Sequence, residues 1–223
     1  MKPIAIFQHC RLSGGDPPIN FDWAIQILIE QFLALQNSGL SAAASEIYVG
    51  VNGGETDAMA AMSIAPAKAI IMQHPDDTRG ELPTLNAVWQ WARSHPGWLC
   101  YYQHTKAATH TGDQLYTNWR HCMERVCVNG WRDCVKALEH GFDMAGAHWL
   151  SSDRYANIGP PFFGGNFWWA TSEFLMTLPE IPKTARTRGE FYQAEVWVSQ
   201  GPRLPRIREW AQHWPGAACA AFV

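Results

Sequence analysis

The fold class of this chain is decided by the stretch YYQHTK, which occupies Tyr101–Lys106. It closes an apolar segment, Trp98–Gln103, whose aromatic residues predict a buried β-strand. The chain turns polar as this strand ends, with His104, Thr105 and Lys106 in a row. An ammonium group can bind phosphate, and an imidazole can bind a metal, phosphate or a hydroxyl group. These residues indicate a site, although a solvated strand end would carry the same types.

Three earlier apolar segments end in the same way and are predicted to be strands. They run over Ile4–Gln8, Ile47–Val51 and Ala69–Met72, and they end in Gln8 and His9, Asn52 and Gly53, and Gln73 and His74. Helical spacing of apolar residues falls between the strands, over about 21–37, 56–62 and 82–94. Strands that alternate with helices predict an α/β fold with a mixed, mainly parallel sheet flanked by helices. Ligands bind beyond the carboxyl ends of such strands, so these polar ends are candidate binding residues.

The rest of the pattern and the composition indicate one domain over 1–223. Helices are expected at about 113–138, 171–178 and 189–199, later strands at Met144–Trp149 and Phe162–Trp169, and irregular structure over 201–223. With 223 residues, 47% of them hydrophobic, the chain can bury a sizeable core. Its formal net charge of −3 gives no general attraction to nucleic acid or to anionic membranes.

Neither a membrane anchor nor secretion is indicated. No apolar run reaches the length of a membrane span, and the apolar part of the N-terminus is too short for a signal peptide. The six cysteines show neither a Cys-x-x-Cys pair nor zinc-like spacing, so buried free thiols are expected. These features predict a cytoplasmic protein.

A second unusual stretch is GGNFWWA, which occupies Gly164–Ala170. Adjacent side chains of a strand point to opposite faces, so Trp168 and Trp169 are not expected to serve one core. We expect one of the two indoles to face a cleft. Beside the amide of Asn166, such an indole could bind a sugar ring, whose C–H face packs on the aromatic ring while its hydroxyls pair with the amide.

Two neighbouring carboxylates are candidates for a metal site. Asp76 and Asp77 could hold Mn²⁺ or Mg²⁺, with His104 as a further weak candidate ligand. The alternative is ordinary turn chemistry, because Pro-Asp-Asp is a common turn sequence. The segment from Thr78 to Glu81 has the form of a helix capping box.

Glu195 is the candidate general base. It lies in a predicted helix near apolar residues, so it is either ion-paired, poised as a base or on a solvated helix face. Asp143 and Asp153 are rival bases. The region 183–208 carries six basic against two acidic side chains, Arg188 among them, and could close over an anionic ligand such as a diphosphate.

Together these motifs resemble a family of glycosyltransferase-like proteins of bacteria and large viruses that are related to the GT-A fold. The resemblance runs from Ile4 to about Ser199. It rests on Ser38–Leu40, Tyr48–Gly53, Tyr102–Ala107, Trp119 with Arg120, Gly164–Ala170, Leu178 with Pro179, Arg188 and Glu195–Trp197. The family pattern predicts a glycine where this chain has Ala107, and an aromatic or similar residue where it has Gln103.

The resemblance implies a transferase that moves a sugar from a nucleotide-sugar donor to a glycan or another hydroxyl acceptor, in surface polysaccharide synthesis. Residues 1–110 would bind the donor, and 111–200 would hold the acceptor and catalytic part. The implied donor-binding residues are Gln8, His9, Asn52, Gly53, Thr84, Leu85, Thr105 and Arg188. The implied catalytic residues are His104, Lys106 and Glu195, and the implied sugar or acceptor residues are Asn166, Trp168 and Trp169.

The resemblance leaves metal dependence open. GT-A enzymes usually end their fourth strand in an Asp-x-Asp motif that holds a divalent metal under the diphosphate, and this chain has His104–Lys106 there. Either Asp76 or Asp77 helps to hold Mn²⁺ or Mg²⁺, or Lys106 and the C-terminal arginines neutralise the diphosphate. Two other classes are a carbohydrate-binding protein without catalysis and a metal-dependent hydrolase. The hydrolase would use Asp76 or Asp77 with His74, His104 and His110.

Overall fold

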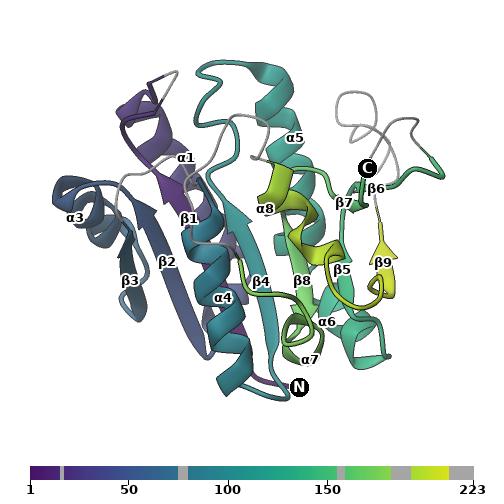
Figure 1. The fold of residues 1–223 in the computed structure, drawn as a ribbon. Helices are drawn as coiled ribbons and strands as arrows, with labels where there is room; N and C mark the ends of the chain where they lie inside the picture. Colours follow the sequence, from purple (N-terminus) through teal and green to yellow (C-terminus); the bar gives the residue numbers. More distant parts are fainter. Residues whose placement is uncertain (16–17, 75–79, 155–158, 182–191, 211–223) are drawn as a thin grey trace.

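One sheet of seven strands runs through the computed structural model, which describes residues 1–15, 18–74, 80–154, 159–181 and 192–210 (Figure 1). The strands are β1 (Ile4–Arg11), β2 (Glu46–Asn52), β3 (Ala69–His74), β4 (Leu99–His104), β5 (Met144–Gly146), β8 (Trp168–Thr171) and β9 (Ile207–Glu209). Their order is β3-β2-β1-β4-β8-β5-β9, and a second sheet pairs β6 (Trp149–Leu150) with β7 (Phe162–Phe163). Only β8 runs antiparallel to its neighbours in the large sheet, so the mixed, mainly parallel α/β fold is confirmed.

Helices cover both faces of this sheet (Figure 1). One face is covered by α1 (Phe21–Asn37), α2 (Leu40–Ala43), α3 (Glu55–Ile64), α5 (Gln114–Glu124), a π-helical turn (Arg125–Asn129) and α6 (Trp131–Glu139). The other is covered by α4 (Leu82–Ser94), α7 (Ser172–Leu175), α8 (Tyr192–Val196) and a 3₁₀ turn (Trp197–Ser199). Because both faces are buried, β1 is apolar at consecutive positions: Ile4 and Ile6 enter one core, and Ala5 and Phe7 enter the other.

The carboxyl ends of β1 to β4 meet at one edge of the sheet, as the sequence predicts. His9 of β1 pairs in register with His104 of β4 and with Gly50 of β2. Asn52 of β2 pairs in register with His74 of β3. The polar residues at these strand ends are therefore neighbours across the sheet.

The expectation that one of the two adjacent indoles faces a cleft is wrong. Trp168 and Trp169 point to opposite faces, as the strand requires, but both are 0% exposed because helices cover both faces. Trp168 stacks on Tyr102 and Trp169 stacks on Tyr101, each with ring centroids 5.1 Å apart. Both indoles are therefore core residues, and neither forms the wall of an open sugar site.

Two smaller expectations also need correction. The region 201–223 is not wholly irregular, because β9 adds a strand parallel to β5 at the sheet edge. Cys10, Cys100, Cys127 and Cys134 are buried free thiols as expected, whereas Cys122 is disulfide-bonded. Pairing across the chain decides both features, so local patterns of residues do not reveal them.

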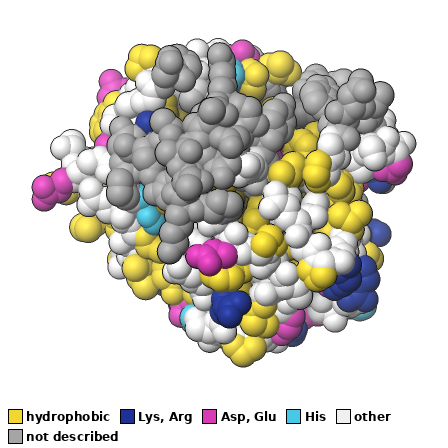
Figure 2. Space-filling view, in the orientation of Figure 1, with side chains coloured by type: hydrophobic (Ala, Val, Ile, Leu, Met, Phe, Trp, Pro, Cys, Tyr) yellow, Lys and Arg dark blue, Asp and Glu magenta, His cyan; other side chains and the backbone are white. Residues whose placement is uncertain are grey.

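Charged and hydrophobic side chains share the described part of one face of the molecule. On the described part of the face seen in Figure 2, acidic and basic side chains are scattered among hydrophobic ones. Within the described residues, no helix is both long and apolar enough to cross a membrane.

The burial of both indoles predicts a large loss of stability on truncation. Trp168→Ala and Trp169→Ala should each lower the free energy of unfolding by about 3–5 kcal/mol, because each leaves a cavity in a closed core. Urea denaturation would measure this, with Leu115→Ala as the control, since Leu115 is 49% exposed and should change stability by less than about 0.5 kcal/mol. A loss below about 1 kcal/mol for either tryptophan variant would contradict the burial of that indole.

Candidate active site

A close approach of α4 to the sheet sets one side of the site. His9 Nδ1 lies 2.8 Å from Oγ1 of Thr84, in the first turn of α4. A Cβ atom at Gly50 would lie 2.1 Å from the same oxygen, so only glycine lets the helix come this near. Burial lowers the pKa of His9 well below its usual value, and the neighbouring basic groups, His104 first and Arg11 among them, add to the shift. His9 and Thr84 thus form a neutral buried pair, and neighbouring Leu85 is a fully buried core residue.

A chain of glutamines lies beneath the strand ends. Gln103 Nε2 donates to Gln8 Oε1 at 2.6 Å, and Gln8 Nε2 donates to Gln31 Oε1 at 3.0 Å. Gln31 Nε2 in turn donates to the carbonyl oxygen of His104 at 2.8 Å. Gln8 is 0% exposed and its amide is committed to these contacts, so it supports the strand ends from below instead of facing a ligand. The same network explains why an amide, Gln103, stands where the family resemblance predicts an aromatic residue.

The end of β2 carries an acceptor without a partner. Asn52 Nδ2 donates to the carbonyl oxygen of Gly80 at 2.6 Å, whereas the buried Asn52 Oδ1 has no hydrogen-bond partner among the described residues. Gly53 follows with φ +155, and a Cβ atom there would lie 2.3 Å from Asp57 Oδ2. Since an unpaired buried acceptor is costly, Asn52 Oδ1 is suited to accept a hydrogen bond from a ligand or from water.

Glu81, which the sequence analysis treats only as part of a capping box, stands at the centre of the site. It directly precedes α4 and makes no side-chain cap to that helix. Its Oε2 accepts hydrogen bonds from the Tyr102 hydroxyl and from Asn166 Nδ2, both at 2.8 Å. Its Oε1 lies 3.5 Å from His104 Nδ1. The only sequence signal for this role is an acidic residue between a strand end and a helix start.

The Gly165 peptide joins the two sides of the site. Its carbonyl oxygen lies 3.0 Å from His104 Nε2, and its N–H donates to the carboxylate of Glu195. Gly165 adopts φ +87, and a Cβ atom there would lie 2.6 Å from Met123 Sδ, so glycine is required. Asn166 follows at φ 56, and its Oδ1 accepts a hydrogen bond from Trp168 Nε1 at 2.8 Å. Trp168 therefore orients Asn166 from inside the core.

Lys106 and Glu195 are the charged pair of the site. Lys106 Nζ lies over the Trp119 ring, 4.0 Å from its centroid. Burial lowers the pKa of Lys106, and the carboxylates of Glu195 and Glu81 oppose that shift. Burial raises the pKa of Glu195 to about 7, with Lys106 opposing the shift and Glu81 adding to it. A carboxyl group that titrates near neutrality is suited to accept a proton in catalysis.

His104 is a neutral member of the site. Burial lowers its pKa to about 3, and the charge of Lys106 adds to that shift. Thr105 is buried beside it, and its backbone N–H donates to the carbonyl oxygen of His9 at 3.0 Å. Positive charge at the described strand ends is therefore supplied by Lys106 and by Arg11 at the end of β1, and not by the histidines.

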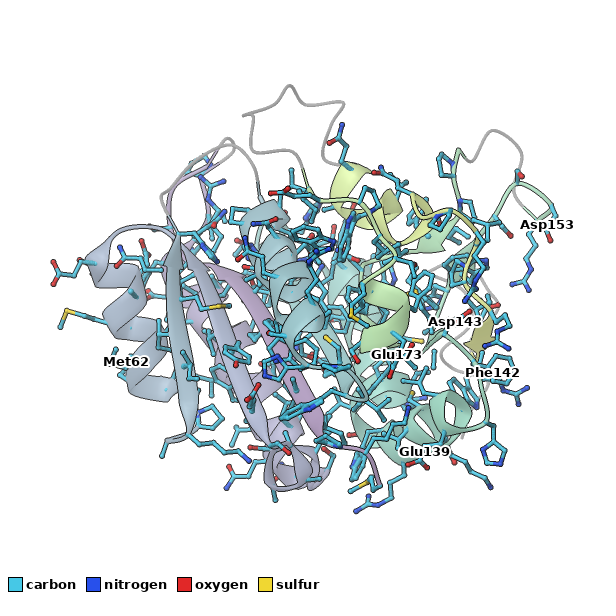
Figure 3. The ribbon with its side chains drawn as sticks, turned by 60° about the horizontal axis from the view of Figure 1, so that its bottom comes forward. Met62, Glu139, Phe142, Asp143, Asp153 and Glu173 are labelled. Atoms are coloured by element: carbon cyan, nitrogen blue, oxygen red, sulfur yellow. The ribbon has the colours of Figure 1, made fainter. Side chains whose placement is uncertain are left out.

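The rival bases lie elsewhere (Figure 3). Burial opposes the charge of Asp143, but hydrogen bonds from Arg203 and from the Arg206 backbone lower its pKa to about 2. Its two oxygens receive Arg203 at 2.6 and 2.9 Å, so Asp143 holds the C-terminal region in an ion pair. Asp153 is exposed at the periphery of the molecule (Figure 3). Neither carboxylate is placed to act with Lys106.

A complete metal site is not found within the described residues, where no three His, Cys, Asp or Glu side chains form a group that could hold a metal ion. Glu81 and His104 approach each other, but His104 Nε2 is engaged by Gly165. Asp76, Asp77 and Arg188 lie outside the described residues. The described side chains alone thus do not fit a divalent metal, and no step is assigned to one. His110, named for the hydrolase alternative, packs on Tyr116 with ring centroids 3.6 Å apart.

The sheet order and the helices on both faces give a GT-A-like fold, which solved structures share. One similar solved structure is a candidate nucleotide-diphospho-sugar transferase from Desulfovibrio desulfuricans G20, with a TM-score of 0.51 and 13% identity over 95% of this chain and 81% of that one. Another is HddC from Yersinia pseudotuberculosis, with a TM-score of 0.51 and 7% identity over 95% and 91%. At these identities the likeness establishes the fold.

The family of the chain follows from its sequence. Residues 19–200 match the family model described as "Domain of unknown function (DUF8361)", and the chain belongs to that family. No curated protein matches the sequence significantly.

Backbone strain at Ala107, next to Lys106, should lower the stability of the protein. Ala107 adopts φ 77, in the left-handed region that costs an L-residue about 1–2 kcal/mol. Ala107→Gly should therefore raise the free energy of unfolding by about 0.5–1 kcal/mol, after the entropy that glycine adds to the unfolded chain. Urea denaturation would measure it, and Ala108→Gly is the matched control because Ala108 lacks a positive φ and should lose stability. Equal losses in the two variants would contradict the strain at Ala107.

The raised pKa of Glu195 predicts how the free energy of unfolding depends on pH. Because its pKa is raised in the folded state, the protein holds this proton more tightly than the unfolded chain does, so its contribution to stability falls as pH rises from about 4.5 to about 7. Glutamine does not titrate, so Glu195→Gln should gain stability relative to wild type between pH 5 and pH 8. Denaturation of both proteins at the two pH values would measure this. A difference that does not change with pH would contradict the raised pKa.

Proposed function

We propose that this protein is a glycosyltransferase that moves a sugar from a nucleotide-diphospho-sugar to a hydroxyl group of a glycan or another acceptor. The observation that carries the proposal is the pairing of Glu195, whose pKa is raised to about 7, with Lys106 at the carboxyl edge of a GT-A-like sheet. A base whose pKa is near neutrality and a partly buried ammonium group are the two groups that such a transfer needs.

The proposed reaction inverts the anomeric centre. Glu195 accepts the proton of the acceptor hydroxyl, and the acceptor oxygen forms a bond to the anomeric carbon of the sugar. The bond from that carbon to the diphosphate oxygen breaks, and the nucleoside diphosphate leaves with the electron pair. Lys106 stabilises the negative charge that develops on the leaving group, and a partly buried cation acts more strongly there than an exposed one because less water screens it.

The donor would lie along the ends of β1, β2 and β4. Asn52 Oδ1, buried and without a partner among the described residues, is suited to accept a hydrogen bond from the nucleotide. Gly53 and Thr105 would contribute backbone beside it, and Asn166 would meet the sugar or acceptor. His9 and Thr84 shape the floor of this site, since their polar atoms pair with each other. Arg188 stays a candidate for the phosphates.

The test is a screen of nucleotide-diphospho-sugars by thermal stabilisation, with and without Mn²⁺. At 100 times its dissociation constant the correct donor should add about 2.7 kcal/mol to the free energy of unfolding. Glu195→Gln should keep this stabilisation and lose turnover, whereas Asp153→Asn, the matched control, should keep both. Lys106→Met should weaken donor binding, because the diphosphate loses its cation.

The outcomes separate the alternatives. No stabilisation by any donor or free nucleoside diphosphate would refute the proposal. Binding of a glycan without a nucleotide would indicate a carbohydrate-binding protein on the same fold. Release of pyrophosphate from a nucleoside triphosphate, instead of a nucleoside diphosphate from the donor, would indicate a nucleotidyltransferase. Retained turnover in Glu195→Gln would leave the fold-level assignment intact and exclude Glu195 as the base.

A further inference from the structure

The proton on Glu81 can be located from the hydrogen-bond donors and acceptors around it. The side chains of Glu81 and His104 are each 17% exposed, and they face each other with Oε1 and Nδ1 3.5 Å apart. One of the two atoms must carry a proton for this approach to be favourable, because two bare lone pairs repel each other. The surrounding contacts decide which of them carries it.

A neutral histidine ring carries one N–H, and in His104 this N–H is directed at Gly165. Its Nε2 lies 3.0 Å from the carbonyl oxygen of Gly165, and a carbonyl group only accepts hydrogen bonds, so Nε2 carries the proton. In a neutral ring Nδ1 is then a bare acceptor. A second proton on Nδ1 would create a buried imidazolium beside Lys106, whose charge, after burial itself, lowers the pKa of His104 to about 3. The bare nitrogen is therefore the favoured state.

The two oxygens of Glu81 have distinct environments. Oε2 accepts from the Tyr102 hydroxyl and from Asn166 Nδ2, each at 2.8 Å, and these two donors occupy both lone pairs of a carbonyl-type oxygen. Oε1 faces only the bare Nδ1 of His104 among the side chains that contact Glu81 in the described residues. This is the arrangement of a protonated acid, with a carbonyl oxygen on one side and a hydroxyl on the other. Burial raises the pKa of Glu81 above its usual value, while the hydrogen bonds from Tyr102 and Asn166 and the charge of Lys106 oppose that shift.

We propose that Glu81 is a neutral carboxylic acid whose hydroxyl group faces Nδ1 of His104 and so positions the site. It links three segments: the start of α4, the end of β4 through Tyr102 and His104, and the turn before β8 through Asn166. The protonation of Glu81 does not depend on the proposed function. Its consequence for the charge of Lys106 does rest on that function. With Glu81 neutral, Lys106 faces one ionisable carboxylate, Glu195, and its positive charge is free for a diphosphate when Glu195 takes up a proton.

The test exploits the likeness between a protonated acid and an amide. In Glu81→Gln the amide supplies an N–H in place of the O–H and a carbonyl in place of Oε2. The melting temperature at pH 7 should therefore stay within about 2 °C of wild type, which corresponds to less than about 1 kcal/mol. Glu81→Leu, which removes every polar partner of Tyr102 and Asn166 at this position, should melt at least about 4 °C lower.

Glu124→Gln is the matched control, because Glu124 is a buried carboxylate that faces a permanent cation. Its Oε1 accepts from Arg120 at 2.9 Å, and Arg120 is 1% exposed. Arg120 also pairs with Glu30, and glutamine at position 124 removes one of these two carboxylate charges from a buried guanidinium, so this variant should melt at least about 4 °C lower. If Glu81→Gln falls as far as Glu124→Gln, Glu81 is an ionised carboxylate and the proposal is wrong.

The second measurement reads the protonation of His104, on which the assignment of the proton to Glu81 depends. The ring nitrogens of His104 can be observed by NMR in ¹⁵N-labelled protein and assigned by the loss of their signals in His104→Asn. From pH 5 to pH 8 their chemical shifts should show a neutral ring that is protonated on Nε2. The same state should persist in Glu81→Gln. A doubly protonated ring at pH 7, or a proton on Nδ1, would overturn the proposal. Neither measurement uses a nucleotide sugar, so failure here is distinct from failure of the proposed transferase activity.

Discussion

The structure depends on the pairing of β8 with β4. This antiparallel contact places Trp168 over Tyr102 on one face and Trp169 over Tyr101 on the other, so two aromatic stacks fix the same strand pair from both sides. Each such stack contributes about 0.5–1.5 kcal/mol beyond the burial of its area. The turn that precedes β8 is thereby held against the end of β4, and without this pairing Gly165 and Asn166 would not reach His104 and Glu81.

The site that results is poor in formal charge. Many of its polar groups form hydrogen bonds with one another. These are the glutamines beneath the strand ends, the His9–Thr84 pair and the contacts of Glu81. Buried histidines that are neutral leave Lys106 and Glu195 as the groups whose charge can respond to a ligand. Electrostatic effects in such a site are stronger than at the surface, because few other charges and little water oppose them.

Much of this fold could be predicted from the sequence, because its signals are local. Apolar runs that end in polar residues predicted the first four strands, and their common edge followed from parallel pairing. The orientation of Trp168 and Trp169 could not be predicted, since it depends on whether helices cover both faces at that point. Strand β9 was missed because three residues give almost no periodic signal, and only its pairing with β5 defines it.

Some members of the candidate site also have local signals in the sequence. His104, Lys106 and Asn166 stand in distinctive motifs, and the structure places them near one another. The role of Glu81 could not be predicted, because its local sequence also fits a helix cap. Its position in the site depends on tertiary contacts with Tyr102, Asn166 and His104. Gln8 was misjudged because a polar residue at a strand end can face either a ligand or the layer beneath.

The contact between Gly50 and Thr84 has a consequence for the evolution of the family. No side chain can be added at position 50 unless the helix retreats or the residue at position 84 shrinks, because a Cβ atom would overlap Oγ1. The two positions are therefore coupled through excluded volume. Homologous chains should change them together or not at all, so joint variation of this pair would trace how far α4 stands from the sheet in each lineage.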